Sequence, residues 1–158
     1  MNHVDMLAKE LGKQGWSQHS FSEHMGWHKE KMNRWKLGRQ SPWISQMEDC
    51  WQALGFTLLP ARLPSITPRL SSGGNDRPLR TISSSHKLVT MLFIEMDDRR
   101  LMRQEVLEIA GLAHDTFRVW ARDPRGGRTS SVEACWNVMG MSMIPFPIST
   151  LGAIHAAA

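Results

Sequence analysis

The stretch of sequence that decides the fold is residues 17–38, which read SQHSFSEHMGWHKEKMNRWKLG. Ser17 has the side chain of a helix N-cap, and it precedes a short segment in which Phe21 and Met25 are spaced four residues apart. That spacing places both apolar side chains on one helical face, toward an interior. Gly26 then permits the left-handed backbone that reverses the chain. The first part of the stretch therefore predicts a short helix that ends in a tight turn.

The second part of the stretch predicts another short helix, capped by His28 after Trp27 fills the corner. Its Met32 and Trp35 lie three residues apart and face the interior. The remaining positions carry long polar side chains that point outward, namely Lys29, Glu30, Lys31, Asn33, Arg34 and Lys36. A solvated charged face explains such a helix without any ligand, and a surface that contacts a polyanion is the alternative.

Residues 17–38 resemble the helix-turn-helix of the Cro/lambda-repressor (XRE) family. With h for an apolar residue, the family pattern Ser-Gln-x-x-h-Ser/Ala-x-x-h-Gly-h-x-x-x-x-h-x-x-Trp-x-x-Gly is met at every fixed position. In that family the start of the second helix reads base edges in the DNA major groove. The resemblance implies that the base-reading residues are Lys29, Glu30 and Arg34, with Lys31 and Asn33 in support and Gln18 on a phosphate. We also expect DNA contacts from His28 and, at a phosphate, from Arg39.

An internal repeat covers most of the chain. When the sequence is shifted by 85 positions, 13 residues of the segment 4–60 are identical to their counterparts. The matches include Trp35 with Trp120, and the pair Cys50-Trp51 with Cys135-Trp136. Tryptophan rarely matches by chance, so we interpret the two segments as copies of one structural unit.

The second copy departs from the family pattern. Met102 and Ala113 stand where capping residues are expected, and Val119 replaces Arg34. We expect polar residues of this copy to contact DNA as well, and these are Arg103, His114, Asp115, Thr116, Arg118, Arg122, Arg125 and Arg128. The backbone at Gly126-Gly127 offers a place for a phosphate. The alternative is a degenerate copy that acts only as a structural partner.

Each copy also carries apolar stripes at helical spacing and ends in a short apolar run. Ser41-Pro42 predicts the start of the helix that Gly55 ends. The runs 56–59 and 141–144 have the composition of short strands, which are unstable alone. This arrangement is similar to the HipB-like antitoxin branch, in which such strands pair across a dimer. We therefore predict an all-α fold of two tandem lambda-repressor-like domains, with a small two-stranded β-ribbon as the optional link that makes the chain a pseudo-dimer.

Composition and charge set the domain boundaries. We expect domains at 1–60 and 88–148, a linker at 61–87 and a flexible tail at 149–158. The linker is rich in Pro, Gly and Ser and holds five basic residues against one acidic residue, so most of the net charge of +4 lies there. Such a segment is a solvated connector or a strip that follows a polyanion.

Several function classes are disfavoured by the sequence. Two cysteines, both in apolar stripes, rule out a disulfide framework and make a poor nucleophile. The histidines lack the spacing and companions of a metal site, and no phosphate-binding loop follows the glycine pairs. No apolar run suits a signal peptide or a membrane span. We expect no enzymatic activity, no cofactor, no metal and no membrane association, and a cytoplasmic location.

The sequence thus predicts a sequence-specific regulator of transcription, most simply a repressor or autoregulator of a bacterium, phage or mobile element. Its partner is a double-stranded DNA operator with two unequal half-sites, and a homodimer of the chain is a further option. The alternative is an antitoxin or antiactivator that binds a toxin or regulator protein. A recombination or partition factor would use the same DNA contacts.

Overall fold

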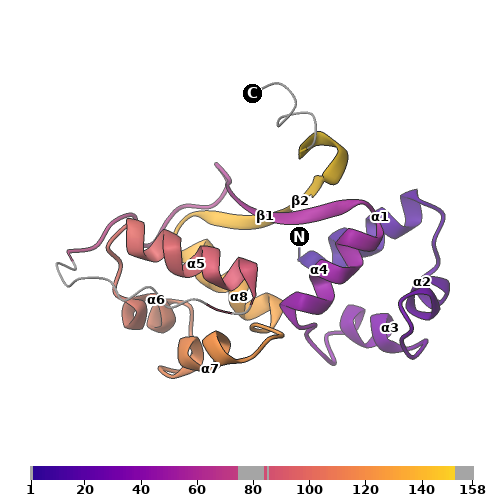
Figure 1. The fold of residues 1–158 in the computed structure, drawn as a ribbon, viewed down its shortest axis with the longest axis horizontal. Helices are drawn as coiled ribbons and strands as arrows, with labels where there is room; N and C mark the ends of the chain where they lie inside the picture. Colours follow the sequence, from indigo (N-terminus) through magenta and orange to yellow (C-terminus); the bar gives the residue numbers. More distant parts are fainter. Residues whose placement is uncertain (1, 75–83, 85, 152–158) are drawn as a thin grey trace.

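The computed structural model describes residues 2–74, 84 and 86–151, and the two copies of the repeat fold alike (Figure 1). The first copy forms α1 (His3–Lys13), α2 (Gln18–His24), α3 (Lys31–Lys36), α4 (Ile44–Ala53) and β1 (Phe56–Arg62). The second copy forms α5 (Lys87–Asp98), α6 (Arg103–Ile109), α7 (Thr116–Arg122), α8 (Thr129–Val138) and β2 (Met141–Pro147). The order of four helices and a strand therefore occurs twice. Parts of the predicted linker and most of the predicted tail lie outside the described residues.

The prediction of an all-α fold is wrong, because β1 and β2 form a two-stranded antiparallel sheet and the fold is mixed α/β. The predicted pairing of the two runs is confirmed, and each strand extends to seven residues. The register places 56–59 opposite 144–147, so Leu59 and Ile144 are the one pair in which both residues belong to the predicted runs. The apolar runs follow Gly55 and Gly140, which end the preceding helices with φ of +86° and +74°. Each run then finds backbone hydrogen-bond partners in the other copy, which stabilises a strand that could not exist alone.

The strand register reveals a pseudo-twofold axis. Leu59 pairs directly with Ile144, and these residues occupy the same position in the two copies, 85 residues apart. The isolated bridge between Trp43 and Arg128 joins another pair of equivalent positions. An antiparallel pairing of a residue with its own counterpart is the signature of a twofold interface. The axis therefore passes through the ribbon and through the contact near the starts of α4 and α8.

Backbone hydrogen bonds near that contact obey the same symmetry. Ile44 N donates to Gly127 O at 2.9 Å, and its counterpart Thr129 N donates to Pro42 O at 2.9 Å. These bonds place the start of α4 at Ile44, with Trp43 as its N-cap residue, so the start predicted from Ser41-Pro42 is wrong by two residues. The backbone N–H groups at both helix starts are instead satisfied by the opposite copy.

The core is built from equivalent residues of the two copies. Every apolar pair below has both members buried: Leu7 and Leu92, Leu11 and Met96, Phe21 and Val106, Met32 and Phe117, Trp35 and Trp120, Met47 and Val132, Cys50 and Cys135, Trp51 and Trp136, and Leu58 and Met143. The stripes predicted from helical spacing are thus confirmed as core. The two copies therefore use equivalent positions for their cores, although several of the paired side chains differ in size and shape.

Two buried histidine–glutamate contacts cross between the copies. His3 Nε2 of α1 lies 3.1 Å from Glu133 of α8, and His86 Nε2 lies 3.1 Å from Glu48 of α4. Lys87 Nζ adds a second contact to Glu48 at 2.7 Å. Glu48 and Glu133 are equivalent positions, so the contacts lie on opposite sides of the pseudo-twofold axis.

We expect these glutamates to make the fold sensitive to acid. Burial opposes ionisation of Glu48 and Glu133 and tends to raise their pKa values. Contacts from His86 and Lys87 at Glu48, and from His3, Ser142 and Met143 N at Glu133, outweigh burial and bring both pKa values below the usual 4.5. A carboxylate with a lowered pKa stabilises the folded state at neutral pH, and this contribution is lost as the pH falls through the folded-state pKa. The melting temperature should therefore drop as the pH falls below 4.5, measured by thermal denaturation between pH 7 and pH 3.

The control is a comparison of glutamine variants. Glu48→Gln and Glu133→Gln should each be less stable than the wild type at pH 7, and the difference should shrink as the pH falls. Glu108→Gln, on the exposed surface of α6, should follow the wild-type curve. A difference between wild type and Glu48→Gln that stays constant down to pH 3 would contradict the assignment.

Candidate nucleic-acid interface

The unit α2–turn–α3 is held by a cap, a buried aromatic and a glycine turn. Ser17 accepts a hydrogen bond from Ser20 N at 3.0 Å, and Ser17 N donates to Ser20 Oγ at 3.2 Å, which closes a capping box at the start of α2. Phe21 is fully buried, and Gly26 has φ of +68° in the turn. The helix, cap and turn predicted for this part of the chain are confirmed.

Helix α3 begins later than predicted. Its first residue is Lys31 and its N-cap is Glu30, whereas His28 only accepts a 3.4 Å hydrogen bond from Glu30 N through its Nδ1 atom. Met32 and Trp35 are buried as predicted, so the polar face of α3 points away from the core. Lys29 and Glu30 therefore lie on the turn that leads into the helix.

Most of the first copy's predicted DNA contacts are on the surface. The side chains of His28, Lys29, Glu30, Asn33, Arg34 and Arg39 are exposed, and Gln18 is half-buried at the first position of α2. Arg34 Nη2 lies 3.7 Å from Glu30, and both side chains are more than half exposed. An exposed pair of this kind is weak, so Arg34 can exchange Glu30 for another acceptor at little cost.

Lys31 differs from its neighbours because its ammonium group is held against the protein. Lys31 Nζ lies 3.9 Å from the ring centroid of Trp27 and 5.6 Å from that of Trp35. Partial burial lowers its pKa from the usual value. A cation–π contact with desolvation is worth more than an exposed ion pair, so we expect Lys31 to brace the turn rather than read a base.

The second copy presents a similar polar face, but an apolar side chain replaces one of the charged ones. His114, Asp115, Arg118 and Arg122 are exposed, and Thr116 is half-buried as the first residue of α7. Val119 is 51% exposed at the position that Arg34 occupies in the first copy. An exposed valine between two arginines gives this helix a surface chemistry different from that of α3.

Three arginines predicted as DNA contacts are engaged within the protein. Arg103 Nη2 lies 3.3 Å from Asp97. Arg125 donates to both carboxylate oxygens of Asp123, at 3.0 and 2.9 Å. Arg128 Nη1 donates to the Ser41 carbonyl at 2.8 Å. These bonds orient the guanidinium groups and give each of them a role in the fold.

Trp43 is a residue that the sequence analysis missed. The guanidinium carbons of Arg125 and Arg128 each lie 4.0 Å from its ring centroid. Trp43 belongs to the first copy and both arginines to the second, so the cluster lies beside the pseudo-twofold axis. No local pattern predicts it, because its members are more than 80 positions apart in the chain.

The expected phosphate contact at Gly126-Gly127 is not supported by the structure. Both glycines are buried. A Cβ atom at Gly126 would lie 2.6 Å from Ile44, and one at Gly127 would lie 2.4 Å from Trp120. The glycines allow close approach of the two copies and of the α7 tryptophan, which is a packing role.

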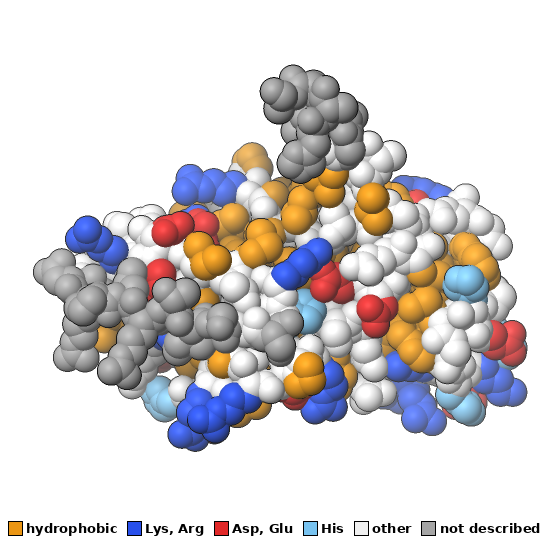
Figure 2. All heavy atoms as spheres, viewed as in Figure 1, with side chains coloured by type: hydrophobic (Ala, Val, Ile, Leu, Met, Phe, Trp, Pro, Cys, Tyr) orange, Lys and Arg blue, Asp and Glu red, His pale blue; other side chains and the backbone are white. Residues whose placement is uncertain are grey.

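The pseudo-twofold axis brings the polar faces of both copies to one edge of the molecule. Figure 1 shows α3 and α7 along the edge farthest from the β1–β2 ribbon. Figure 2 shows lysine and arginine side chains gathered along that same edge. The elements predicted to contact DNA thus share one accessible, basic surface, which we call the α3/α7 edge.

The described part of the linker does not extend toward that edge as a free strand. Arg69 Nη1 donates to the Ile109 carbonyl at 3.3 Å, and the backbone N–H groups of Arg69 and Leu70 donate to Val138 O. These bonds fasten the linker to the second copy. The linker arginines at positions 77 and 80 lie outside the described residues.

The two cysteines lie in equivalent core positions. Both thiols are buried, and burial raises the pKa of Cys50 and Cys135 to about 12. A thiol with such a pKa stays protonated at neutral pH and is a poor nucleophile. Within the described residues, His, Cys, Asp and Glu side chains form no cluster of three that could hold a metal ion.

Comparisons of the chain with known protein families, with curated proteins and with solved structures found no match. The resemblance of residues 17–38 to the XRE family therefore stays a prediction. Over the described residues, no helix has both the length and the apolar character to cross a membrane.

Proposed function

We propose that this chain binds double-stranded DNA through the α3/α7 edge and acts as a transcriptional regulator of the XRE helix-turn-helix type. The observation that supports this most strongly is the pseudo-twofold arrangement, which places two equivalent short helices on one exposed basic edge. B-DNA presents its major groove on one face once per turn, about 34 Å apart, to a protein with matching symmetry.

The chemistry of the first copy suits direct readout of a base pair. Arg34 and Lys29 carry the donors that pair with guanine O6 and N7, and Glu30 accepts from cytosine N4. All three side chains are exposed: Lys29 and Glu30 lie just before α3, and Arg34 lies in its last turn. The ion pair between Arg34 and Glu30 is weak enough to open when a base edge replaces it.

The second copy reads a different sequence in this proposal. Val119 stands where Arg34 stands in the first copy, and an apolar side chain contacts the methyl group of thymine rather than guanine. His114 and Asp115 replace Lys29 and Glu30. One chain therefore recognises two unequal half-sites, which an ordinary homodimer would not favour.

In vitro selection of duplex DNA with the full chain tests the proposal. The expected result is an enriched sequence with two non-identical half-sites about one helical turn apart. A Lys29→Ala/Arg34→Ala variant should lose the enrichment at one half-site only. Selection that enriches no duplex sequence over the starting pool would overturn the proposed function.

Arg39 is expected to hold the DNA backbone rather than a base, because it follows the C-terminal end of α3 and is exposed. Arg39→Ala should weaken binding to all sequences alike and reduce the slope of log K against log salt by about 1. Filter binding or fluorescence anisotropy at several salt concentrations measures both effects. Arg62→Ala removes the same charge at the end of β1 and should change neither the affinity for DNA nor the salt slope. A loss confined to one sequence would reject the phosphate role.

A further inference from the structure

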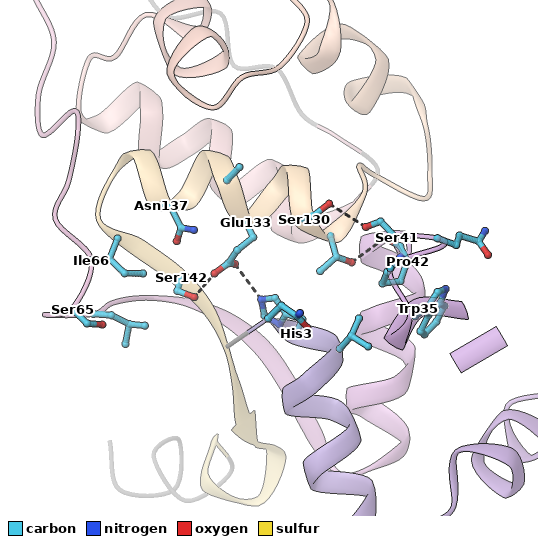
Figure 3. Close-up of a pocket in the computed structure, with 17 residues that line it drawn as sticks. His3, Trp35, Ser41, Pro42, Ser65, Ile66, Ser130, Glu133, Asn137 and Ser142 are labelled. Carbon is cyan, nitrogen blue, oxygen red and sulfur yellow. Dashed lines mark hydrogen bonds and ion pairs between the residues drawn. The ribbon is translucent and has the colours of Figure 1, made fainter. Parts of the chain in front are cut away.

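The pseudo-twofold axis leaves the molecule at the α3/α7 edge, through the segments that join α3 to α4 and α7 to α8. Trp43 and Arg128 pair across the axis as equivalent positions of the two copies. Figure 3 shows Ser41 beside Ser130 of the other copy, with their hydroxyl oxygens 3.1 Å apart. In Figure 1 the segment that joins α7 to α8 lies between α7 and α3, on the side away from the ribbon. A side chain at this point therefore faces the same partner as the two helices.

Two guanidinium groups of the second copy stack on a tryptophan of the first copy at this point. The guanidinium carbons of Arg125 and Arg128 each lie 4.0 Å from the ring centroid of Trp43. Arg125 also donates to both carboxylate oxygens of Asp123, and Arg128 Nη1 donates to the Ser41 carbonyl. We call Trp43, Asp123, Arg125 and Arg128 the axis cluster. It holds two fixed positive charges against one negative charge.

Arg125 is the member of the axis cluster that can reach a partner. Its side chain is 57% exposed, whereas that of Asp123 is 16% exposed and Arg128 is half-buried. The two bonds to Asp123 use Nε and Nη2 of Arg125, and Nη1 has no hydrogen-bond partner among the described residues. Figure 2 shows basic side chains at the middle of the α3/α7 edge as well as toward its two ends. The orientation of Arg125 is therefore fixed, and one of its nitrogens is available.

The geometry of B-DNA determines what such a group would meet. When two helices occupy successive major grooves one turn apart, the minor groove faces the protein half a turn from each of them. Stretches of A·T pairs have a narrow minor groove with a more negative potential, which attracts an inserted arginine. A G·C pair instead projects the N2 amino group of guanine into this groove. An arginine on the axis can therefore distinguish base pairs that neither helix touches.

We propose that Arg125 enters the minor groove at the centre of the bound duplex, and that affinity depends on the base pairs at that centre. This inference rests on the proposed function and adds a third contact between the two half-sites. The residue equivalent to Arg125 in the first copy is Gln40, which carries no charge. The central contact is therefore made by the second copy alone.

The test keeps both selected half-sites and changes only the central base pairs, to A·T, to G·C or to inosine·cytosine. Inosine lacks the N2 amino group of guanine, so its pair with cytosine resembles A·T in the minor groove and G·C in the major groove. The full chain should bind the A·T and inosine·cytosine centres about fivefold or more tightly than the G·C centre. Fluorescence anisotropy with the three duplexes measures the Kd values.

Variants of the full chain assign this preference to Arg125. Arg125→Ala should bring the three Kd values within about twofold of one another, mainly through weaker binding of the A·T and inosine·cytosine centres. Arg125→Lys keeps the charge but loses the planar group that stacks on Trp43, so it should restore only part of the preference. The matched control is Arg62→Ala, which removes one positive charge at the end of β1 and should keep the wild-type ratio of Kd values.

Three results would overturn the inference: equal Kd values for the A·T and G·C centres, an inosine·cytosine centre that binds like G·C, or an unchanged preference in Arg125→Ala. The last result would confine Arg125 to holding Trp43. The comparison of duplexes uses the wild-type chain, so it decides the question even if a variant does not fold. A selected duplex whose centre has no effect would overturn this inference alone, whereas the absence of any selected duplex would also disprove the proposed function.

Discussion

Replacement of Leu58 by alanine is expected to lower the free energy of unfolding by about 2–5 kcal/mol. Leu58 is fully buried in β1, and its backbone pairs with Pro145 of β2. Truncation removes apolar contacts and leaves a cavity where the two copies join, and the surrounding strands can close that cavity only in part. Urea denaturation followed by circular dichroism measures the loss.

The chain offers a matched control for this variant. Leu37 is 55% exposed after the end of α3, and Leu37→Ala should change the stability by no more than about 0.5 kcal/mol. Because the ribbon fixes one copy relative to the other, Leu58→Ala should also weaken binding to a two-half-site duplex. Equal stability of the two variants would show that the ribbon contributes little to the fold.

Replacement of Arg34 by alanine is expected to cost about 1–3 kcal/mol of binding free energy at the selected duplex, and to relax sequence preference at one half-site. The physical reason is the loss of a bidentate donor to a guanine edge. Arg34 is exposed on α3 and shares only a long 3.7 Å contact with Glu30, so its removal should leave the fold intact. Fluorescence anisotropy with the selected duplex and with single-base variants measures both effects.

Two controls separate base reading from a loss of charge. Arg62→Ala removes one positive charge at the ribbon and should leave affinity and preference unchanged. Lys29→Ala should behave like Arg34→Ala, with relaxed preference at the same half-site. If Arg34→Ala weakened all duplexes equally, Arg34 would be a phosphate contact and not a reader.

The repeated architecture could be predicted from the sequence because the physical signal is local and occurs twice. The spacing of Phe21, Met32 and Trp35 identified core positions, and the glycine at position 26 identified the turn. The pairing of the two apolar runs was predicted from the resemblance to the HipB-like branch, and their instability as isolated strands agrees with it. The all-α class was wrong because the same two runs form an antiparallel sheet.

The remaining features depend on contacts between the copies, which no local pattern contains. The start of α4 is set by bonds to the second copy and not by Ser41-Pro42. Arg125 and Arg128 look like free basic residues in the sequence, yet both contact Trp43. The contact between His3 and Glu133 joins residues 130 positions apart.

The most direct test of the central claim is the stoichiometry and footprint of the complex with the selected duplex, measured by native mass spectrometry and hydroxyl-radical footprinting. The account predicts one chain per duplex, with protection of two half-sites of different sequence about one helical turn apart. Two chains on an exact palindrome, or protection of a single half-site by one chain, would contradict it.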